Sequence, residues 1–378
     1  MVFMALDHVR DFLNRDAMSF SPTDLAKTTP TLFLTRWITH FCLPVFMFCA
    51  GVGMFLWRRR GRTTPQLSRF LVTRGVWFVA LELTVMQFAY DFNVSDKCLF
   101  LLLILWIFGI CMIIMALLVH LPLRLLAALS VAIIVLHNLL DGVDSSSFGS
   151  ASSAWRVLHQ PGFVLLSGRQ VLITYTVLPW IGVTAAGFCF ARLYTLEGAV
   201  RRRYMTLIGV AATTAFVVLR LFNHYGDPEP WTSQRSLLFT ILSFLNCTKY
   251  PGSLDFVLMT LGPAILLLAW FDGLSLSSSN PLIVFGRVPM FYFVLHFYLI
   301  HTLLVVMSFL RYGPAASNFI FNPPPSMAGP AQLFPANFGY SVGIVYVIWI
   351  CLVVALYPVC RWFARIKSRR RDWWLSYL

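Results

Sequence analysis

Long apolar runs, each of about twenty residues, follow one another along most of this chain. A run of that length lets a helix cross the hydrocarbon core of a bilayer. The alternating segments of about ten residues that are typical of a membrane β-barrel are not visible. The pattern therefore predicts an all-α fold, a polytopic transmembrane helical bundle of about ten spans. The expected spans lie at roughly 1–13, 34–57, 74–93, 98–120, 121–140, 171–193, 204–222, 254–271, 281–307 and 340–362.

Basic residues gather in three blocks between these spans, at 58–62, 201–203 and 367–371. Loops rich in Arg and Lys stay on the cytoplasmic side of a membrane. Each block follows an even-numbered span, so the pattern places both termini in the cytoplasm. We expect one transmembrane domain over residues 1–378, with an interfacial helix in the second external loop. The external loops are expected at about 14–33, 141–170, 223–253 and 308–339.

Composition supports the membrane interpretation. Of the 378 residues, 58% are hydrophobic and only 12% are charged, whereas soluble domains are about one quarter charged. The net charge of +14 lies in short loops between spans, so it does not indicate a nucleic-acid partner. The eight cysteines are scattered without metal-ligand spacing, and we expect no metal. Met1 already begins inside an apolar run, so we expect a truncated first span or a misassigned start.

The second expected span opens with two polar residues, Arg36 and His40. They are four residues apart, so on a helix they share one face. A charged or titratable side chain inside a membrane is costly and is usually functional. We therefore take His40 as a candidate catalytic base and Arg36 as a candidate substrate-binding residue. The alternative for Arg36 is a side chain that only reaches the lipid headgroups.

The outer end of the first span carries a second candidate group, Asp7, His8 and Asp11. His8 is a candidate base that a neighbouring carboxylate could orient. The alternative is an ion-pair network of the two carboxylates with Arg10. Further polar residues in or beside the spans suggest a cavity open to the outside, although His296, among aromatic residues, also fits a packing role. These substrate-binding candidates are Asp91, Lys249, Asp255, His296 and His301.

On the cytoplasmic side, Arg287 lies in the ninth expected span between Gly286 and Pro289. An arginine there could bind the phosphates of an anionic ligand arriving from the cytosol. The alternative is a structural kink with an arginine that reaches toward the interface.

Four stretches of the chain, 7–12, 36–51, 246–262 and 285–301, resemble the bacterial DUF1624 membrane family. That family is related to the catalytic domain of heparan-α-glucosaminide N-acetyltransferase, a lysosomal enzyme. The similarity to the bacterial family extends over nearly the whole chain. The similarity to the lysosomal enzyme is much weaker and rests essentially on the first two spans.

The resemblance implies a reaction in which cytosolic acetyl-CoA donates an acetyl group to a sugar across the membrane. The lysosomal enzyme's catalytic His lies in the loop between its first two spans, but here residues 14–35 contain no His. The matching span places His40 where that enzyme has an Asp, and His8 near its polar Asn. The base therefore falls to His8 or His40, with Asp7 or Asp11 orienting it.

The sequence thus predicts an integral membrane acyltransferase of the bacterial inner membrane. Its donor would be acetyl-CoA, contacted by Arg287, and its acceptor would be a glycan or sugar-lipid outside the cytoplasm. Its expected partner is the lipid bilayer. The sequence is compatible with both a monomer and a homo-oligomer. One alternative is a transporter or permease with a buried Asp/His/Arg relay. Another is a catalytically inactive relative.

Overall fold

The computed structural model describes the chain except for residues 95–98, 167, 278, 371, 373–374 and 376–378. The chain forms two compact units, each assembled from separate stretches of sequence. The first unit comprises Met1–Cys42, Thr84–Leu99 and Ser275–Leu378. The second unit comprises Leu43–Leu83 and Phe100–Leu274.

Helices dominate both units, so the predicted polytopic helical fold is confirmed. Among the described residues, eight helical stretches are long and apolar enough to cross a membrane. The expected first and fourth spans are shorter, because α1 (Val2–Leu13) covers 12 residues and α7 (Ile104–Leu118) covers 15. The eight stretches are Pro30–Arg59, Thr64–Asp91, Leu123–Leu140, Val177–Thr195, Gly198–Phe222, Leu254–Phe271, Pro289–Asn318 and Val342–Arg369.

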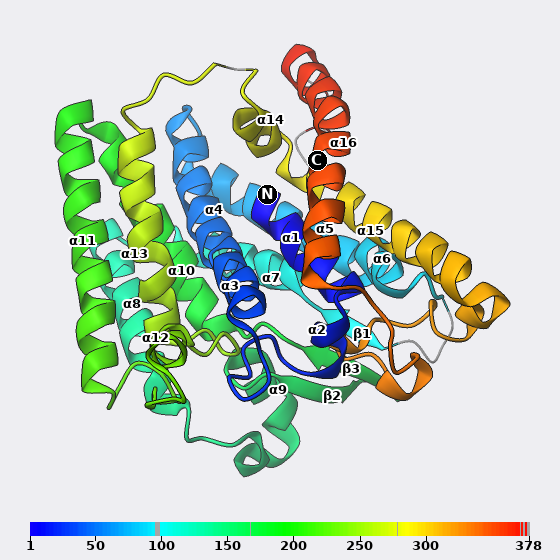
Figure 1. Cartoon of the computed structure of the whole chain (residues 1–378). Helices are drawn as coiled ribbons and strands as arrows, with labels where there is room; N and C mark the ends of the chain where they lie inside the picture. Colours follow the sequence, from blue (N-terminus) through cyan, green and yellow to red (C-terminus); the bar gives the residue numbers. More distant parts are fainter. Residues whose placement is uncertain (95–98, 167, 278, 371, 373–374, 376–378) are drawn as a thin grey trace. The chain divides into compact units, whose positions relative to one another are not determined.

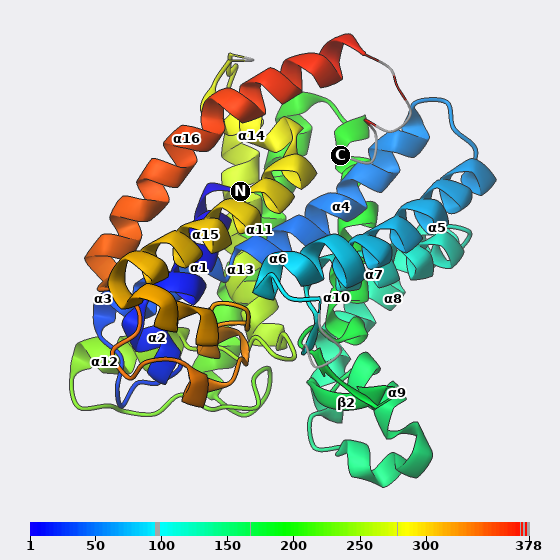
Figure 2. The same ribbon diagram turned by 90° about the vertical axis from the view of Figure 1, so that its right-hand side faces the viewer.

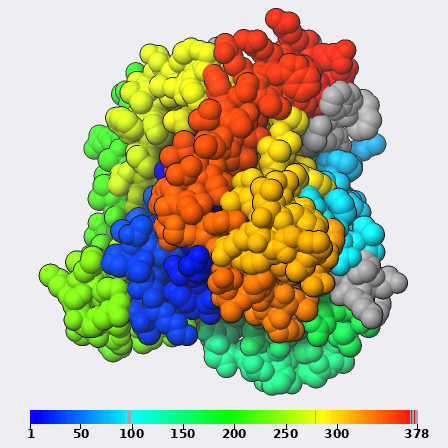
Figure 3. Space-filling view, turned by 45° about the vertical axis from the view of Figure 1, so that its right-hand side comes forward, coloured from blue at the N-terminus to red at the C-terminus, as the bar shows by residue number. Residues whose placement is uncertain are grey.

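In the first unit, α1 packs against α3 (Pro30–Thr39), α15 (Pro289–Tyr312) and α16 (Val342–Arg369) (Figures 1 and 2). The side chains of α16 lie along the surface, orange to red in Figure 3. Only 11% of the most apolar 18-residue stretch of this helix is buried. The elements of this unit are α1 (Val2–Leu13), α2 (Arg15–Ser19), α3 (Pro30–Thr39), α6 (Gln87–Asp91), α14 (Pro281–Arg287), α15 (Pro289–Tyr312), η5 (Gly313–Asn318), η6 (Pro325–Met327), η7 (Ala331–Leu333) and α16 (Val342–Arg369).

Prolines break two of the expected spans. The second span is split into α3, which ends at Thr39, and α4, which begins at Cys42. Pro44 has no N–H with which to bond the carbonyl of His40, four residues earlier, so the helix is interrupted there. The ninth span is split at Val288, because the residue before Pro289 disfavours the helical conformation.

In the second unit, helices pair where glycine lets two backbones approach. A Cβ atom built on Gly75 of α5 would lie 2.6 Å from the carbonyl oxygen of Gly109 in α7. Close approach at small residues is a common way for membrane helices to pack. The elements are α4 (Cys42–Arg59), α5 (Thr64–Leu81), η1 (Glu82–Met86, which continues toward α6), β1 (Phe100–Leu102), α7 (Ile104–Leu118), α8 (Leu123–Leu136), η2 (His137–Leu140), η3 (Ser145–Ala151), α9 (Ser152–Leu158), β2 (Gly162–Leu166), β3 (Arg169–Ile173), α10 (Val177–Phe190), η4 (Ala191–Thr195), α11 (Gly198–Phe222), α12 (Leu237–Leu245) and α13 (Leu254–Phe271).

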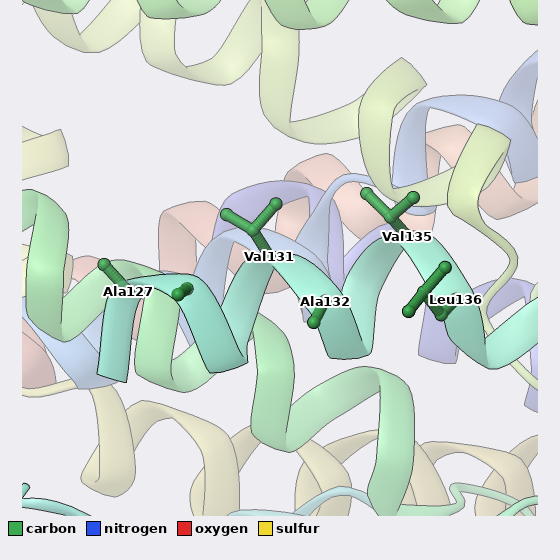
Figure 4. A pocket seen from close by; sticks show the side chains of 6 residues that line it. Ala127, Val131, Ala132, Val135 and Leu136 are labelled. Carbon is green, nitrogen blue, oxygen red and sulfur yellow. The ribbon is translucent and has the colours of Figure 1, made fainter. Parts of the chain in front are cut away.

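The outer face of α8 is apolar and forms an open groove (Figure 4). It suits contact with lipid chains. The side chains that line the groove are Ala127, Ala128, Val131, Ala132, Val135 and Leu136.

A small sheet occupies part of what was expected to be loop and span. Strand β3 pairs in parallel with β1 and antiparallel with β2. Together with α9 the strands form a lobe beyond the helices of this unit (Figure 2). The expected helical starts of the fourth and sixth spans were therefore wrong, although residue 98 itself lies outside the described residues. Apolar runs of four to eight residues cannot be told apart as strand or helix by periodicity.

Other helix boundaries also differ from those expected from the sequence. The third span begins at Thr64 and not near residue 74, because Thr63 and Gln66 form a capping box. Helix α11 begins at Gly198 and so includes the basic block 201–203. The expected first and third external loops contain α2 and α12.

Candidate active site

Asp7 on α1 is the centre of a buried ion-pair network in the first unit. Its carboxylate accepts two hydrogen bonds from Arg36 Nη1 on α3, at 2.9 and 3.0 Å. Thr39 Oγ1, one turn further along α3, donates to Asp7 Oδ1 at 2.7 Å. Arg10 Nη2 lies 2.7 Å from the same oxygen. The network therefore ties α1 to the first half of the broken second span.

Arg10 extends the network to a second carboxylate. Its Nη2 donates to Asp11 Oδ1 at 2.6 Å, so the ion pairs considered from the sequence are present. The side chain is only 1% exposed. Within the described part of the chain, Arg10 Nε and Nη1 are buried without a hydrogen-bond partner. Buried donors are nearly always paired in native proteins, so two orphaned ones need an explanation, such as an ordered water or a bound group.

His8 lies on α1 between these residues in sequence but contacts α15. Its Nδ1 is 2.6 Å from Nε2 of His296, and the two rings stack with centroids 4.9 Å apart. His296 Nδ1 is in turn 2.9 Å from the backbone oxygen of Tyr292. The ring centroids of Phe297 and His8 are 4.1 Å apart. The structure thus brings together two predicted site residues that are 288 positions apart in the chain.

His40 is buried at the end of α3, where the second span breaks. Its backbone N–H donates to the carbonyl of Trp37 at 3.0 Å and closes the last turn of the helix. The break places this histidine at an irregular point of the backbone, which is a common position for functional residues.

Asp91 and His301, also in the first unit, hold backbone groups. Asp91 Oδ1 accepts a hydrogen bond from the backbone N–H of Asn93 at 3.0 Å, at the end of α6. His301 Nδ1 is 2.9 Å from the oxygen of Ala89, and its Nε2 is 3.1 Å from that of Ile320. These contacts indicate that both side chains support the backbone around the site.

Lys249 and Asp255 belong to the second unit. The ammonium of Lys249 lies 5.2 Å from the centre of the Tyr250 ring. Asp255 Oδ2 is 3.9 Å from Arg220 Nη1, which also lies 3.8 Å from Asp227 Oδ1. This second buried cluster, built around Arg220, joins α11 to Asp227 in the loop that follows it and to Asp255 in the first turn of α13.

Arg287 is the last residue of α14 and is exposed. It therefore does not lie inside a continuous span, and the kink considered from the sequence is present. Among the described residues, no three His, Cys, Asp or Glu side chains are grouped as a metal ion would require.

Two residues of these clusters, Thr39 and Arg220, could not be identified from the sequence. Thr39 looked like an ordinary polar residue in a span, and only its spacing of three from Arg36 hinted at a shared face. Arg220 lies near the end of an apolar span, where an arginine by default reaches the interface. Its buried guanidinium donates to carbonyl groups at the end of α12 and in the segments that flank this helix, and no local pattern signals such contacts.

The matched region of the chain identifies its family. Residues 1–222 match the family model described as heparan-alpha-glucosaminide N-acetyltransferase, catalytic. The chain belongs to this family. No curated protein and no solved structure matches the chain. The match covers more than half of the 378 residues, includes His8 and His40, and ends at Phe222, the last residue of α11.

Proposed function

We propose that this protein is a multi-pass membrane acetyltransferase that moves an acetyl group from cytosolic acetyl-CoA to a sugar or glycan outside the cytoplasm. The observation that carries the proposal is the position of His8. It lies within the region that matches the catalytic family and hydrogen-bonds His296 through Nδ1. It also lies on the helix whose carboxylates are held by two arginines. A histidine with one fixed nitrogen suits general base catalysis.

The proposed reaction balances without a metal. His8 Nε2 removes a proton from the acceptor hydroxyl or amine, which attacks the carbonyl carbon of the acetyl thioester. The tetrahedral intermediate collapses, the carbon–sulfur bond breaks, and the leaving thiolate takes the proton back from His8. The products are the acetylated acceptor and coenzyme A.

The arginine and carboxylate groups receive supporting roles in this proposal. Arg36 stabilises the negative charge that develops on the acetyl oxygen, while Asp7 and Asp11 hydrogen-bond acceptor hydroxyls. His40 is the second candidate base. Exposed Arg287 contacts the phosphates of coenzyme A. We place the protein in the bacterial inner membrane.

The test uses purified full-length protein in proteoliposomes, with labelled acetyl-CoA and a panel of amino sugars and glycolipids. Label should appear in at least one acceptor, and acetyl-CoA should raise the temperature of thermal unfolding. Transport of a substrate without any response to acetyl-CoA would instead support the permease alternative. Thermal stabilisation without transfer to any acceptor would support an inactive relative.

A further inference from the structure

We infer that His296 is a positioning residue that fixes the tautomer of His8 and so directs its basic nitrogen. The role of His8 as a base rests on the proposed function. The tautomer itself follows from hydrogen-bond chemistry alone. It replaces the expectation from the sequence that His296 binds substrate.

The backbone of α15 fixes the tautomer of His296. The oxygen of Tyr292 can only accept a hydrogen bond, so His296 Nδ1, 2.9 Å away, must carry the proton. A neutral imidazole has one protonated nitrogen, and His296 is completely buried. Its Nε2 therefore holds a lone pair.

His296 in turn fixes the tautomer of His8. His8 Nδ1 lies 2.6 Å from this lone pair, so Nδ1 must be the donor and carries the proton of neutral His8. The lone pair of His8 is then on Nε2. The nitrogen that accepts a proton in the proposed reaction is thus selected by a carbonyl group that lies two hydrogen bonds away.

Packing keeps this arrangement rigid. The carbonyl belongs to a continuous helix, and Phe293 packs edge-on against both imidazoles. The His8 and His296 rings are inclined by only 25°. A base whose orientation is held by neighbours loses little entropy in the reaction.

The arrangement also explains how His8 can accept a proton beside an apolar aromatic cluster. Protonated His8 becomes a charged donor to His296 Nε2, and charge-assisted hydrogen bonds are roughly twice as strong as neutral ones. Without an acceptor at position 296, the proton of neutral His8 could move to Nε2 and block the base. A wrong tautomer of this kind should lower kcat by roughly 10²–10⁴-fold.

The experiment compares the wild type with His296→Gln and His296→Phe. The Gln amide can accept from His8 and donate to Tyr292, whereas Phe preserves an aromatic ring but cannot accept. Solid-state NMR of ¹⁵N-histidine-labelled protein in proteoliposomes reports the tautomer, and His8→Ala assigns the signal. We expect a protonated Nδ1 on His8 in the wild type and in His296→Gln.

In the acetyl-transfer assay, His296→Phe should lose kcat with little change in KM, and His296→Gln should recover much of it. A proton on Nε2 of wild-type His8 would overturn the inference, as would a folded His296→Phe variant with wild-type kcat. The tautomer is measured in the wild type, so the test survives a variant that fails to fold. A correct tautomer without acetyl transfer would support the assignment and overturn only the proposed function.

Discussion

Two arginines, Arg10 in the first unit and Arg220 in the second, are both 1% exposed, yet they are used differently. The guanidinium nitrogens of Arg220 donate hydrogen bonds to backbone carbonyl groups. Its Nε donates to Phe244, its Nη1 to Glu229, and its Nη2 to Ser243 and Asn246. Arg10 contacts only carboxylates, through Nη2, and its other two nitrogens have no hydrogen-bond partner in the described structure.

The contrast separates a structural cation from one in a functional region. A guanidinium whose donors are all used fixes a loop and has nothing left to offer a ligand. A guanidinium with buried, unused donors is retained at a cost, and proteins tolerate such costs mainly at functional sites. We therefore propose that the active site lies in the first unit, around α1, and that the Arg220 cluster stabilises the fold.

The largest effect on stability should come from Arg220→Met. This substitution leaves four backbone carbonyls without their donor and two carboxylates without a nearby cation. We expect a loss of about 3–5 kcal/mol in the free energy of unfolding. Thermal unfolding and size exclusion in detergent would measure it. Arg203→Met is the matched control, since Arg203 is exposed on the same helix and should change stability by less than about 0.5 kcal/mol. Equal stability of the two variants would contradict the structural role.

The second prediction tests packing in the second unit. A Cβ on Gly51 of α4 would lie 2.0 Å from the Thr184 carbonyl oxygen, whereas a Cβ on Gly53 would meet nothing within 4 Å. Gly51→Ala should therefore cost about 1–3 kcal/mol because α4 and α10 must separate. Gly53→Ala on the same helix should be neutral or stabilising by about 0.5–1 kcal/mol. Similar unfolding temperatures for both variants would show that α4 and α10 do not touch at Gly51.

The third prediction concerns Arg10→Met, which should destabilise the protein less than Arg220→Met and should lower acetyl transfer. Arg36 still pairs with Asp7 in this variant, so we expect a loss of only about 1–3 kcal/mol. Acetyl transfer should fall roughly 10–100-fold, because the carboxylates beside His8 lose their position. Arg15→Met, an exposed neighbour, is the control. If Arg10→Met unfolds the protein as Arg220→Met does, the distinction between the two arginines fails.

Long apolar elements could be predicted from the sequence, and contacts across the chain could not. The eighth expected span, 254–271, matches α13 residue for residue, because a polar segment and the N-cap Ser253 precede a continuous apolar run. The strands β1 and β3 were missed because their apolar runs are short. In the site, the pairing of Asp7 with Arg10 follows from helical spacing. The pairing of His8 with His296 depends on how α1 packs on α15, which no local pattern encodes.

The central claim, that His8 is the base of an acetyl transfer across the membrane, is tested most directly by one rate measurement. Transfer of labelled acetyl from acetyl-CoA should be compared for wild type, His8→Ala and His40→Ala in proteoliposomes, with His120→Ala, an exposed histidine, as control. The account predicts that His8→Ala abolishes transfer while the protein stays folded and His120→Ala keeps the wild-type rate. Normal transfer by folded His8→Ala would contradict it, and normal transfer by both His8→Ala and His40→Ala would eliminate the proposed site.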